Sequence, residues 1–272
     1  MPELPEVETV CRGLRRALKG TSITRVVLRR KNLRTAFPAG FVKKLQGRDI
    51  LSIKRRAKYI LMHLSGDLVL IVHLGMTGRF SVELPPKKYA KHDHVIFHLN
   101  DGRVAIYNDA RRFGLMELCD ASEIKQHRLL SHLGPEPLTR VFSPEYLAGA
   151  LSKRSAPIKP VLMDQELVVG VGNIYASEAL FLTGISPLVK ASEVANRAPE
   201  LVEAIQRVLK SAIASGGSSL QDFVQVSGEA GYFQHQFKVY GRRGKPCFTC
   251  GIPLESIQQA GRSSFYCPSC QK

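Results

Sequence analysis

Four cysteines near the C-terminus have the spacing of a metal site. Two residues separate Cys247 from Cys250 and Cys267 from Cys270, and 16 residues lie between the two pairs. Two thiolates at this spacing can turn toward one ion, and two such pairs complete the tetrahedron that Zn²⁺ prefers. A redox motif or disulfides would not explain two matched pairs in an intracellular protein. We therefore predict one structural zinc ion, because protein ligands fill all four positions.

The N-terminus carries residues suited to nucleophilic and acid–base chemistry. A small second residue such as Pro2 normally allows removal of the initiator methionine, which would leave a secondary amine. An α-amino group has a pKa of about 7.7–8.0, so a sizeable fraction is neutral and nucleophilic near pH 7. Glu3 and Glu6 could serve as acids or bases, but acidic residues also suit the start of a helix. The residues alone leave open that Pro2 merely begins the chain.

The composition is that of a globular, basic protein. Of 272 residues, 44% are hydrophobic and 23% charged, and 39 Lys and Arg against 23 Asp and Glu give a net charge of +16. Such a balance favours nucleic acid as a partner, although a basic surface can also be a general feature of a soluble protein. No apolar run approaches the roughly 20 residues that span a bilayer, and the acidic N-terminus is unlike a signal peptide. We expect an intracellular protein without membrane contact, in which Cys11 and Cys119 are buried thiols.

Apolar periodicity predicts the elements that position these residues. A stripe at three- and four-residue steps over 7–18 predicts an N-terminal helix. Short β-branched and aromatic runs, with hairpin turns at 65–67 and 100–102, predict strands in a sandwich or barrel. The expected strands are 23–28, 50–53, 59–64, 68–74, 80–84, 95–99, 104–107 and 113–118. Beyond a Gly- and Pro-containing boundary at 133–137, helices are expected over 144–151, 157–163, 174–182 and 199–214.

Short motifs along the whole chain resemble those of the bacterial formamidopyrimidine-DNA glycosylase family. The matching stretches are 1–9 (MPELPEVET), 56–59 (RAKY), 73–78 (HLGMTG), 91–94 (KHDH), 111–114 (RRFG), 133–137 (LGPEP), 170–178 (GVGNIYASE), 231–233 (GYF), 239–242 (VYGR) and the cysteine finger. Each motif is weak alone, but their order from the first residue to the last is highly specific. Leu4, between Glu3 and Pro5, is more similar to the purine-specific branch than to the endonuclease VIII-like branch.

The resemblance implies an α+β multidomain fold. Residues 1–133 would form the catalytic domain, an N-terminal helix plus a β-sandwich. Residues 134–237 would form a helical DNA-binding domain with a helix–two-turns–helix element and a lesion-capping loop at about 215–236. Residues 238–272 would form a β-hairpin zinc finger. The implied protein is a monomer of the bacterial cytoplasm, associated with the nucleoid through DNA, with no organic cofactor.

The implied activity is removal of oxidised purines from damaged double-stranded DNA, followed by strand cleavage through β,δ-elimination. Pro2 would attack the sugar and form a Schiff base, and Glu3 would supply protons to the sugar or leaving group. Lys58 and Arg262 would donate protons in β- and δ-elimination. Read without the resemblance, Glu3 complements a helix dipole, Lys58 belongs to a basic strand edge and Arg262 is a solvated turn residue.

A base inside a duplex is out of reach, so the enzyme would flip it out of the stack. The resemblance implies that Met76, Arg111 and Phe113 fill the vacated space, although Met76 and Phe113 are of types usually found in a core. The other implied DNA contacts are His92, Arg154, Asn173 and Lys159. The implied lesion pocket contains Glu6, Ser219 and Tyr232.

Three positions depart from the family pattern. Ala110 stands where proline is common, and Arg154 stands where lysine is common. Gln221 stands where a basic residue is frequent, and this departure leaves the fine lesion preference open.

Three other functions remain as alternatives. A non-catalytic zinc-finger DNA-binding protein would not need Pro2 and Glu3. An RNA-binding module would carry aromatic recognition motifs that this chain lacks. An oxidised-pyrimidine glycosylase would differ only in its lesion.

Overall fold

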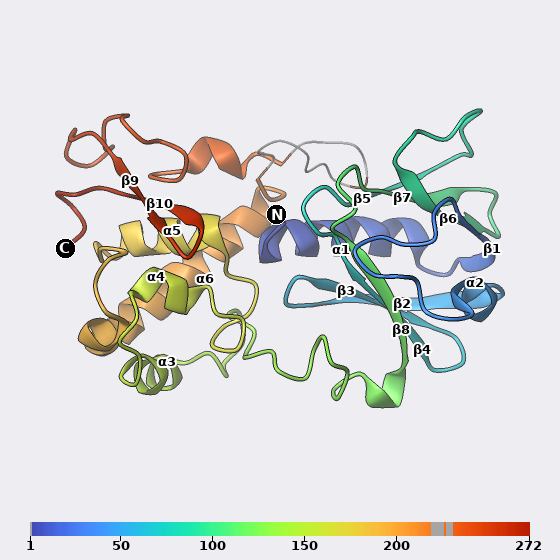
Figure 1. Cartoon of the computed structure of the whole chain (residues 1–272), viewed down its shortest axis with the longest axis horizontal. Coiled ribbons are helices and arrows are strands. Elements are labelled where there is room, and N and C mark those ends of the chain that lie inside the picture. Colours follow the sequence, from blue (N-terminus) through green and yellow to red (C-terminus); the bar gives the residue numbers. More distant parts are fainter. Residues whose placement is uncertain (1, 219–225, 227–230) are drawn as a thin grey trace. The chain divides into compact units, whose positions relative to one another are not determined.

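A computed structural model of the chain describes residues 2–218, 226 and 231–272 (Figure 1). The chain divides into two compact units. The first comprises Met1–Ser131 and Ser215–Tyr232, and the second comprises His132–Ala214 and Phe233–Lys272. Among the helices of the described residues, none combines the length and the apolar character needed to cross a membrane.

The first unit begins with helix α1 (Leu4–Leu18), and the predicted stripe is its buried face. Val7, Leu14 and Leu18 are at most 1% exposed. Burying each such side chain contributes about 1.5–3 kcal/mol. The helix begins at Leu4, after its N-cap residue Glu3. The Glu3 N–H donates a hydrogen bond to the Glu6 side chain at 2.9 Å. The helix ends at Lys19, whose backbone is extended.

Eight antiparallel strands follow, at the positions that the sequence predicts. They are β1 (Ser22–Leu28), β2 (Arg48–Arg56), β3 (Tyr59–Leu64), β4 (Leu68–His73), β5 (Arg79–Glu83), β6 (Asp93–Leu99), β7 (Val104–Asn108) and β8 (Leu115–Asp120). Their order is β5-β7-β6-β1-β2-β3-β4-β8. The β1–β2 junction pairs only Ser22 with Asp49 and Ile23 with Arg48. The sheet therefore consists of two four-stranded halves joined at a short seam.

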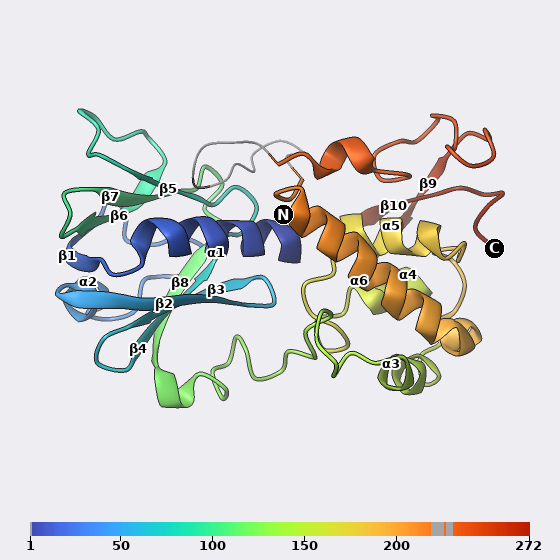
Figure 2. The same cartoon turned by 180° about the vertical axis from the view of Figure 1, so that it is seen from behind.

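Both halves pack against one apolar core that includes the buried face of α1. In Figures 1 and 2, β5 and β7 lie on one side of α1, and β2 and β4 lie on the other. This arrangement is the helix plus β-sandwich that we predicted. The unit also contains the short helix α2 (Phe41–Leu45) and the 3₁₀ turn η1 (Ala121–Glu123).

The second unit is helical and carries a two-stranded hairpin. Its elements are α3 (Pro144–Leu151), α4 (Ile158–Leu162), α5 (Asn173–Leu182), η2 (Ala191–Arg197), α6 (Ala198–Ala214), η3 (Phe233–Gln236), β9 (Glu255–Gln259) and β10 (Arg262–Tyr266). Helix α5 packs against α6 and against β10. Val239, Leu254 and Cys267 form a small core with Phe181 at the end of α5. Helices and finger thus form one compact unit, and the separate boundary at 237/238 stays a prediction.

Candidate functional site

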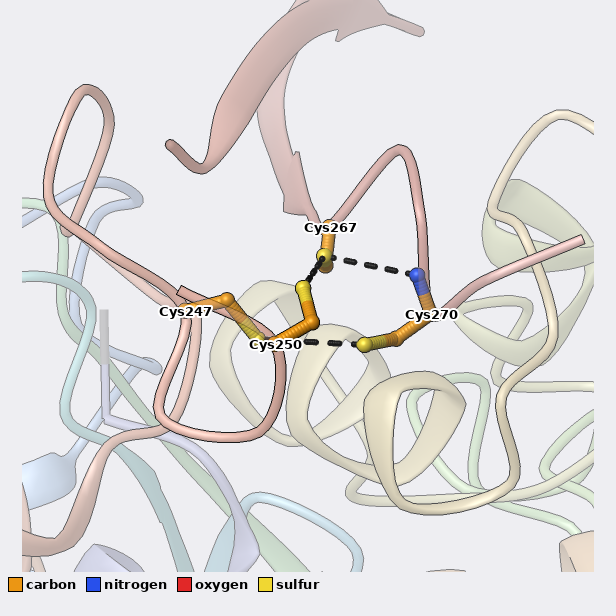
Figure 3. A group of neighbouring side chains, drawn as sticks. All are labelled: Cys247, Cys250, Cys267 and Cys270. Atoms are coloured by element: carbon orange, nitrogen blue, oxygen red, sulfur yellow. Dashed lines mark hydrogen bonds between the residues drawn. The ribbon is translucent and has the colours of Figure 1, made fainter. Parts of the chain in front are cut away.

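The four cysteines of the second unit lie close enough together to hold one metal ion (Figure 3). All four Sγ atoms lie within 4.8 Å of one another. The Sγ–Sγ distance is 3.9 Å for Cys247 and Cys270 and 3.5 Å for Cys250 and Cys267. Thiolates about 2.3 Å from a tetrahedral Zn²⁺ lie about 3.8 Å apart, so this cluster has the size of a four-thiolate zinc site.

Backbone amides support the sulfur ligands. The N–H groups of Thr249 and Cys270 donate to the Sγ atoms of Cys247 and Cys267, both at 3.4 Å. Such donors stabilise the negative charge of a metal-bound thiolate. The two Cys-x-x-Cys pairs therefore offer the charge and hydrogen bonding, as well as the spacing, that a structural zinc ion requires.

The other two cysteines are separate from this cluster. Burial raises the pKa of Cys11 to about 12 and that of Cys119 to about 11, so both remain thiols near neutral pH. Cys11 is buried as predicted, whereas Cys119 is only half-buried.

At the start of α1, Pro2, Glu3 and Glu6 are all buried. Glu3 is 3% exposed and Glu6 is 2% exposed. One Glu6 oxygen accepts from the Glu3 N–H, and the other accepts from the N–H and hydroxyl of Ser218 at 2.9 and 3.0 Å. Glu6 therefore ties the beginning of the helix to the base of the loop that follows Ser218.

The described ends of that loop lie together. Ser218 pairs with Tyr232 in an antiparallel bridge, and the Tyr232 N–H donates to the Ser215 carbonyl at 3.1 Å. Tyr232, a predicted lesion-pocket residue, is 65% exposed. Ser219, also predicted there, and Gln221 lie outside the described residues. The structure thus joins Glu6 to the base of the predicted capping loop.

Lys58 lies in the two-residue turn between β2 and β3, where Arg56 pairs with Tyr59. The side chain is buried, with 7% exposed. Ala57 before it has a φ of 52°, a backbone conformation that alanine rarely adopts, and Arg55 holds the turn by donating to the Ala57 carbonyl at 3.0 Å. The cation is therefore held in a fixed turn rather than on a solvated strand edge.

His73 is a neighbouring residue that the sequence reasoning left without a role. Burial, together with the charges of Lys58 and Arg34, lowers the pKa of His73 to about 4. Its Nδ1 accepts from the Gly75 N–H at 3.0 Å, which fits a neutral ring. The Lys58 charge therefore stands beside a neutral imidazole at neutral pH.

Met76, Arg111 and Phe113 come from two loops of the first unit and are exposed. Met76 is 37% exposed and Phe113 is 44% exposed, so neither is a core residue. The Arg111 guanidinium lies 4.7 Å from the centre of the Phe113 ring. His92, another predicted DNA contact, is half-buried beside His94. These two loops therefore present Met76, Phe113 and the stacked cation of Arg111 on the surface of the first unit.

In the second unit, Lys159 joins the helices to the finger. It is 1% exposed, and its Nζ donates to Asn173 Oδ1 at 2.5 Å, to Ser264 Oγ at 2.8 Å and to the Ser263 carbonyl at 3.2 Å. Asn173 Nδ2 also donates to the Ser263 carbonyl, at 3.1 Å. These bonds tie α4, α5 and β10 together, and a contact of Lys159 with DNA stays a prediction.

Arg262 begins β10 and is exposed. It lines a cavity of 230 Å³ together with Lys159, Asp164, Gln259 and other residues of α4 and the hairpin. Arg154, a predicted DNA contact, pairs with Asp164 at 2.9 Å. Arg262 at the start of β10 therefore lines a cavity whose wall also includes the buried Lys159.

Glu178 on α5 is a further residue that the sequence reasoning did not assign. It is 3% exposed and accepts the backbone N–H groups of Lys238, Val239 and Tyr240 at 2.8, 3.0 and 2.8 Å. Its pKa is raised by burial, which these three hydrogen bonds oppose. Glu178 thus fixes the start of the finger segment on the helical core.

Comparison with known proteins places this chain, with its buried N-terminal acid pair, basic turn and four-cysteine cluster, among the DNA glycosylases. The family model described as Formamidopyrimidine-DNA glycosylase N-terminal domain matches residues 1–116. The Formamidopyrimidine-DNA glycosylase H2TH domain matches 133–224, and the Zinc finger found in FPG and IleRS matches 244–272. The chain belongs to the formamidopyrimidine-DNA glycosylase family.

Relatives match over their full length. The chain is 49% identical to the Formamidopyrimidine-DNA glycosylase of Dinoroseobacter shibae and 48% identical to that of a Ruegeria species (strain TM1040), each over 100% of both chains. Its structure is similar to a Lactococcus lactis FPG mutant in complex with a Fapy-dG containing DNA, with a TM-score of 0.92, 35% identity and 100% of both chains covered. It is also similar to the MutM (FPG) protein of Thermus thermophilus, with a TM-score of 0.89, 40% identity and 99% and 98% covered.

The chain is therefore a base-excision repair enzyme, a DNA glycosylase with AP lyase activity. The predictions of the family, of the fold and of one structural zinc ion are confirmed.

Proposed function

We propose that this protein removes 8-oxoguanine and formamidopyrimidines from duplex DNA, with the amine of Pro2 as its nucleophile. The observation that carries the proposal is the burial of Pro2 beside Glu3 and Glu6 at the start of α1. A buried acid next to a neutral amine is the arrangement that covalent base excision needs. The Lactococcus lactis relatives in complex with Fapy-dG or abasic-site DNA support this choice of substrate.

The chemistry proceeds in balanced steps. The Pro2 nitrogen bonds to the anomeric carbon while the bond from that carbon to the base breaks, and Glu3 supplies a proton to the sugar or leaving group. The nitrogen then loses its proton, and the bond from the anomeric carbon to the ring oxygen O4′ breaks as that oxygen takes up a proton, which leaves a C=N⁺ iminium ion. The resulting iminium ion withdraws electrons, so a proton is lost from the adjacent carbon and the 3′ C–O bond breaks. Lys58 serves the β-elimination and Arg262 the δ-elimination that follows, each as proton donor. Both cations also hold phosphate.

The remaining predicted residues hold the DNA. We assign Met76, Arg111 and Phe113 to the space left by the flipped nucleotide, since all three are exposed. The proposed backbone contacts are His92, Arg154, Asn173 and Lys159. The proposed lesion pocket is Glu6, Ser219 and Tyr232.

We further propose the working form of the protein. It acts as a monomer on nucleoid DNA in the bacterial cytoplasm. Residues 1–133 carry the catalysis, 134–237 bind DNA and cap the lesion, and 238–272 grip DNA through the finger.

Excision from matched duplexes tests the proposed lesion. We expect protein with confirmed loss of Met1 to cut a duplex with one 8-oxoguanine opposite cytosine at least about tenfold faster than one with an oxidised pyrimidine, a difference of about 1.4 kcal/mol. Binding without any cut would favour a non-catalytic zinc-finger protein. Faster cutting of the pyrimidine duplex would assign the chain to the pyrimidine-preferring branch.

Removal of zinc is expected to unfold the finger and weaken DNA binding. Structural zinc contributes about 10–16 kcal/mol to the folding of isolated zinc-finger peptides, so the 238–272 segment should not keep its fold without it. Zinc content, circular dichroism and DNA affinity would be followed during chelation and for Cys270→Ser. Cys119→Ser is the matched control, because that half-buried thiol lies outside the metal cluster. Unchanged DNA affinity after verified zinc loss would reject the role of the finger.

A further inference from the structure

The two loops that carry Met76, Arg111 and Phe113 meet at one buried carboxylate, that of Asp109. Asp109 follows β7 and is 0% exposed. Its Oδ1 accepts from the Thr77 hydroxyl at 2.5 Å, and its Oδ2 accepts from the Gly114 N–H at 2.8 Å. Oδ2 also accepts from the Tyr107 hydroxyl at 3.3 Å. One side chain therefore bonds to both loops.

Thr77 extends this network to Arg111. The Arg111 N–H donates to Thr77 Oγ1 at 3.0 Å. Because a hydroxyl has one hydrogen, its donation to Asp109 leaves its lone pairs free to accept from Arg111. The network thus includes Arg111, Thr77 and Gly114. Thr77 directly follows Met76, and Gly114 directly follows Phe113.

Two glycines let the loops approach at this point. Gly75 has a φ of 68°, and a Cβ there would lie 2.3 Å from the carbonyl carbon of Phe113. A Cβ on Gly114 would lie 1.8 Å from the Tyr107 hydroxyl oxygen. At Gly75 the two loop backbones therefore pack directly against each other, and at Gly114 the backbone packs against the Tyr107 side chain, so the spacing between the two loops has little freedom.

We propose that Asp109 is a positioning residue that fixes Met76, Arg111 and Phe113 relative to one another for insertion into DNA. The inference rests on the proposed function of these three residues. Flipping a nucleotide costs unstacking and unpairing energy, and side chains inserted into the stack act on the step that is opened. Their positions relative to one another should therefore matter most for that step. Loss of the Asp109 network therefore slows removal of a base that must first be flipped, more than it slows cleavage where the base is already missing.

The test compares excision with cleavage of a preformed abasic site. Asp109→Asn replaces one acceptor oxygen with a donor, so it cannot accept from both Thr77 and Gly114. Thr77→Val removes the hydroxyl and nearly preserves the shape of the side chain, whereas Thr77→Ser keeps the hydroxyl. Thr21→Val is the matched control: Thr21 is 8% exposed against 9% for Thr77, and its hydroxyl donates to the Leu18 carbonyl at 2.8 Å, away from both loops.

We expect Asp109→Asn and Thr77→Val to slow single-turnover excision of 8-oxoguanine by about tenfold or more, with abasic-site cleavage within about threefold of wild type. Thr77→Ser and Thr21→Val should keep both rates. Equal losses in the two reactions, or no loss in Thr77→Val, would overturn the inference. If Asp109→Asn does not fold, the three threonine variants decide alone. Failure of the wild type to excise would instead reject the proposed function.

Discussion

Glu3→Gln is expected to slow base excision by about 10²–10⁴-fold, the usual contribution of a general acid. Glutamine keeps the size of the side chain and one acceptor oxygen but has no acidic proton to give to the departing base. Glu3 is 3% exposed, so bulk water has little access to replace it. Single-turnover excision from an 8-oxoguanine duplex measures the effect.

The matched control is Glu8→Gln on the same helix. Glu8 pairs with Arg12 and Arg55, each at 3.1 Å, and is only partly buried. The Glu8–Arg55 pair is largely buried, with 18% and 11% of the two side chains exposed, so Glu8→Gln should lose about 1.5–3 kcal/mol of stability. Glutamine still accepts a hydrogen bond from Arg55, so the folded variant should keep its excision rate. An excision rate of Glu3→Gln close to that of Glu8→Gln would remove Glu3 from the proton transfer.

Protein in which Pro2 is no longer terminal should bind damaged DNA without cutting it. Insertion of one glutamine between Met1 and Pro2 converts the proline nitrogen into an amide, whose lone pair is delocalised into the carbonyl and is not nucleophilic. We expect excision and strand cleavage to fall to background while DNA affinity stays within a few-fold of wild type.

Pro2→Gly supplies the comparison, because it still offers a terminal amine of ordinary pKa. It should retain measurable cutting, unlike the insertion variant. Excision by the insertion variant at the wild-type rate, with its N-terminus verified by mass spectrometry, would exclude the terminal amine as nucleophile.

The periodicity of apolar residues predicted the helices and strands that bury one face. All eight strands of the first unit and α1, α3, α4, α5 and α6 lie where the apolar spacing indicates. The pattern missed α2, whose five residues are too short to show a helical period, and the 3₁₀ segment η2.

The site residues differ in how far they could be predicted. The zinc ligands could be predicted from spacing alone, because they form two pairs of cysteines and each pair is only three residues apart in the sequence. Lys159 was predicted as a DNA contact, yet its partners Ser263 and Ser264 lie 104 and 105 residues further along the chain. No local pattern indicates a pairing at that distance.

The buried carboxylates Asp109 and Glu178 were not predicted, because their partners are backbone N–H groups or hydroxyls in other segments. A signal did exist for Glu178. It is an acidic residue in helix α5, whose other residues carry no charge and are mostly apolar, and a buried acid there requires internal donors.

The measurement that tests the central claim most directly is borohydride trapping on a duplex with one 8-oxoguanine opposite cytosine, followed by peptide mapping. Borohydride reduces an iminium ion to a stable amine, so it records which nitrogen bonded to the sugar. Our account predicts one covalent adduct, on the nitrogen of Pro2. An adduct on Lys58, or strand cleavage with no adduct by protein whose Met1 is confirmed absent, would contradict it.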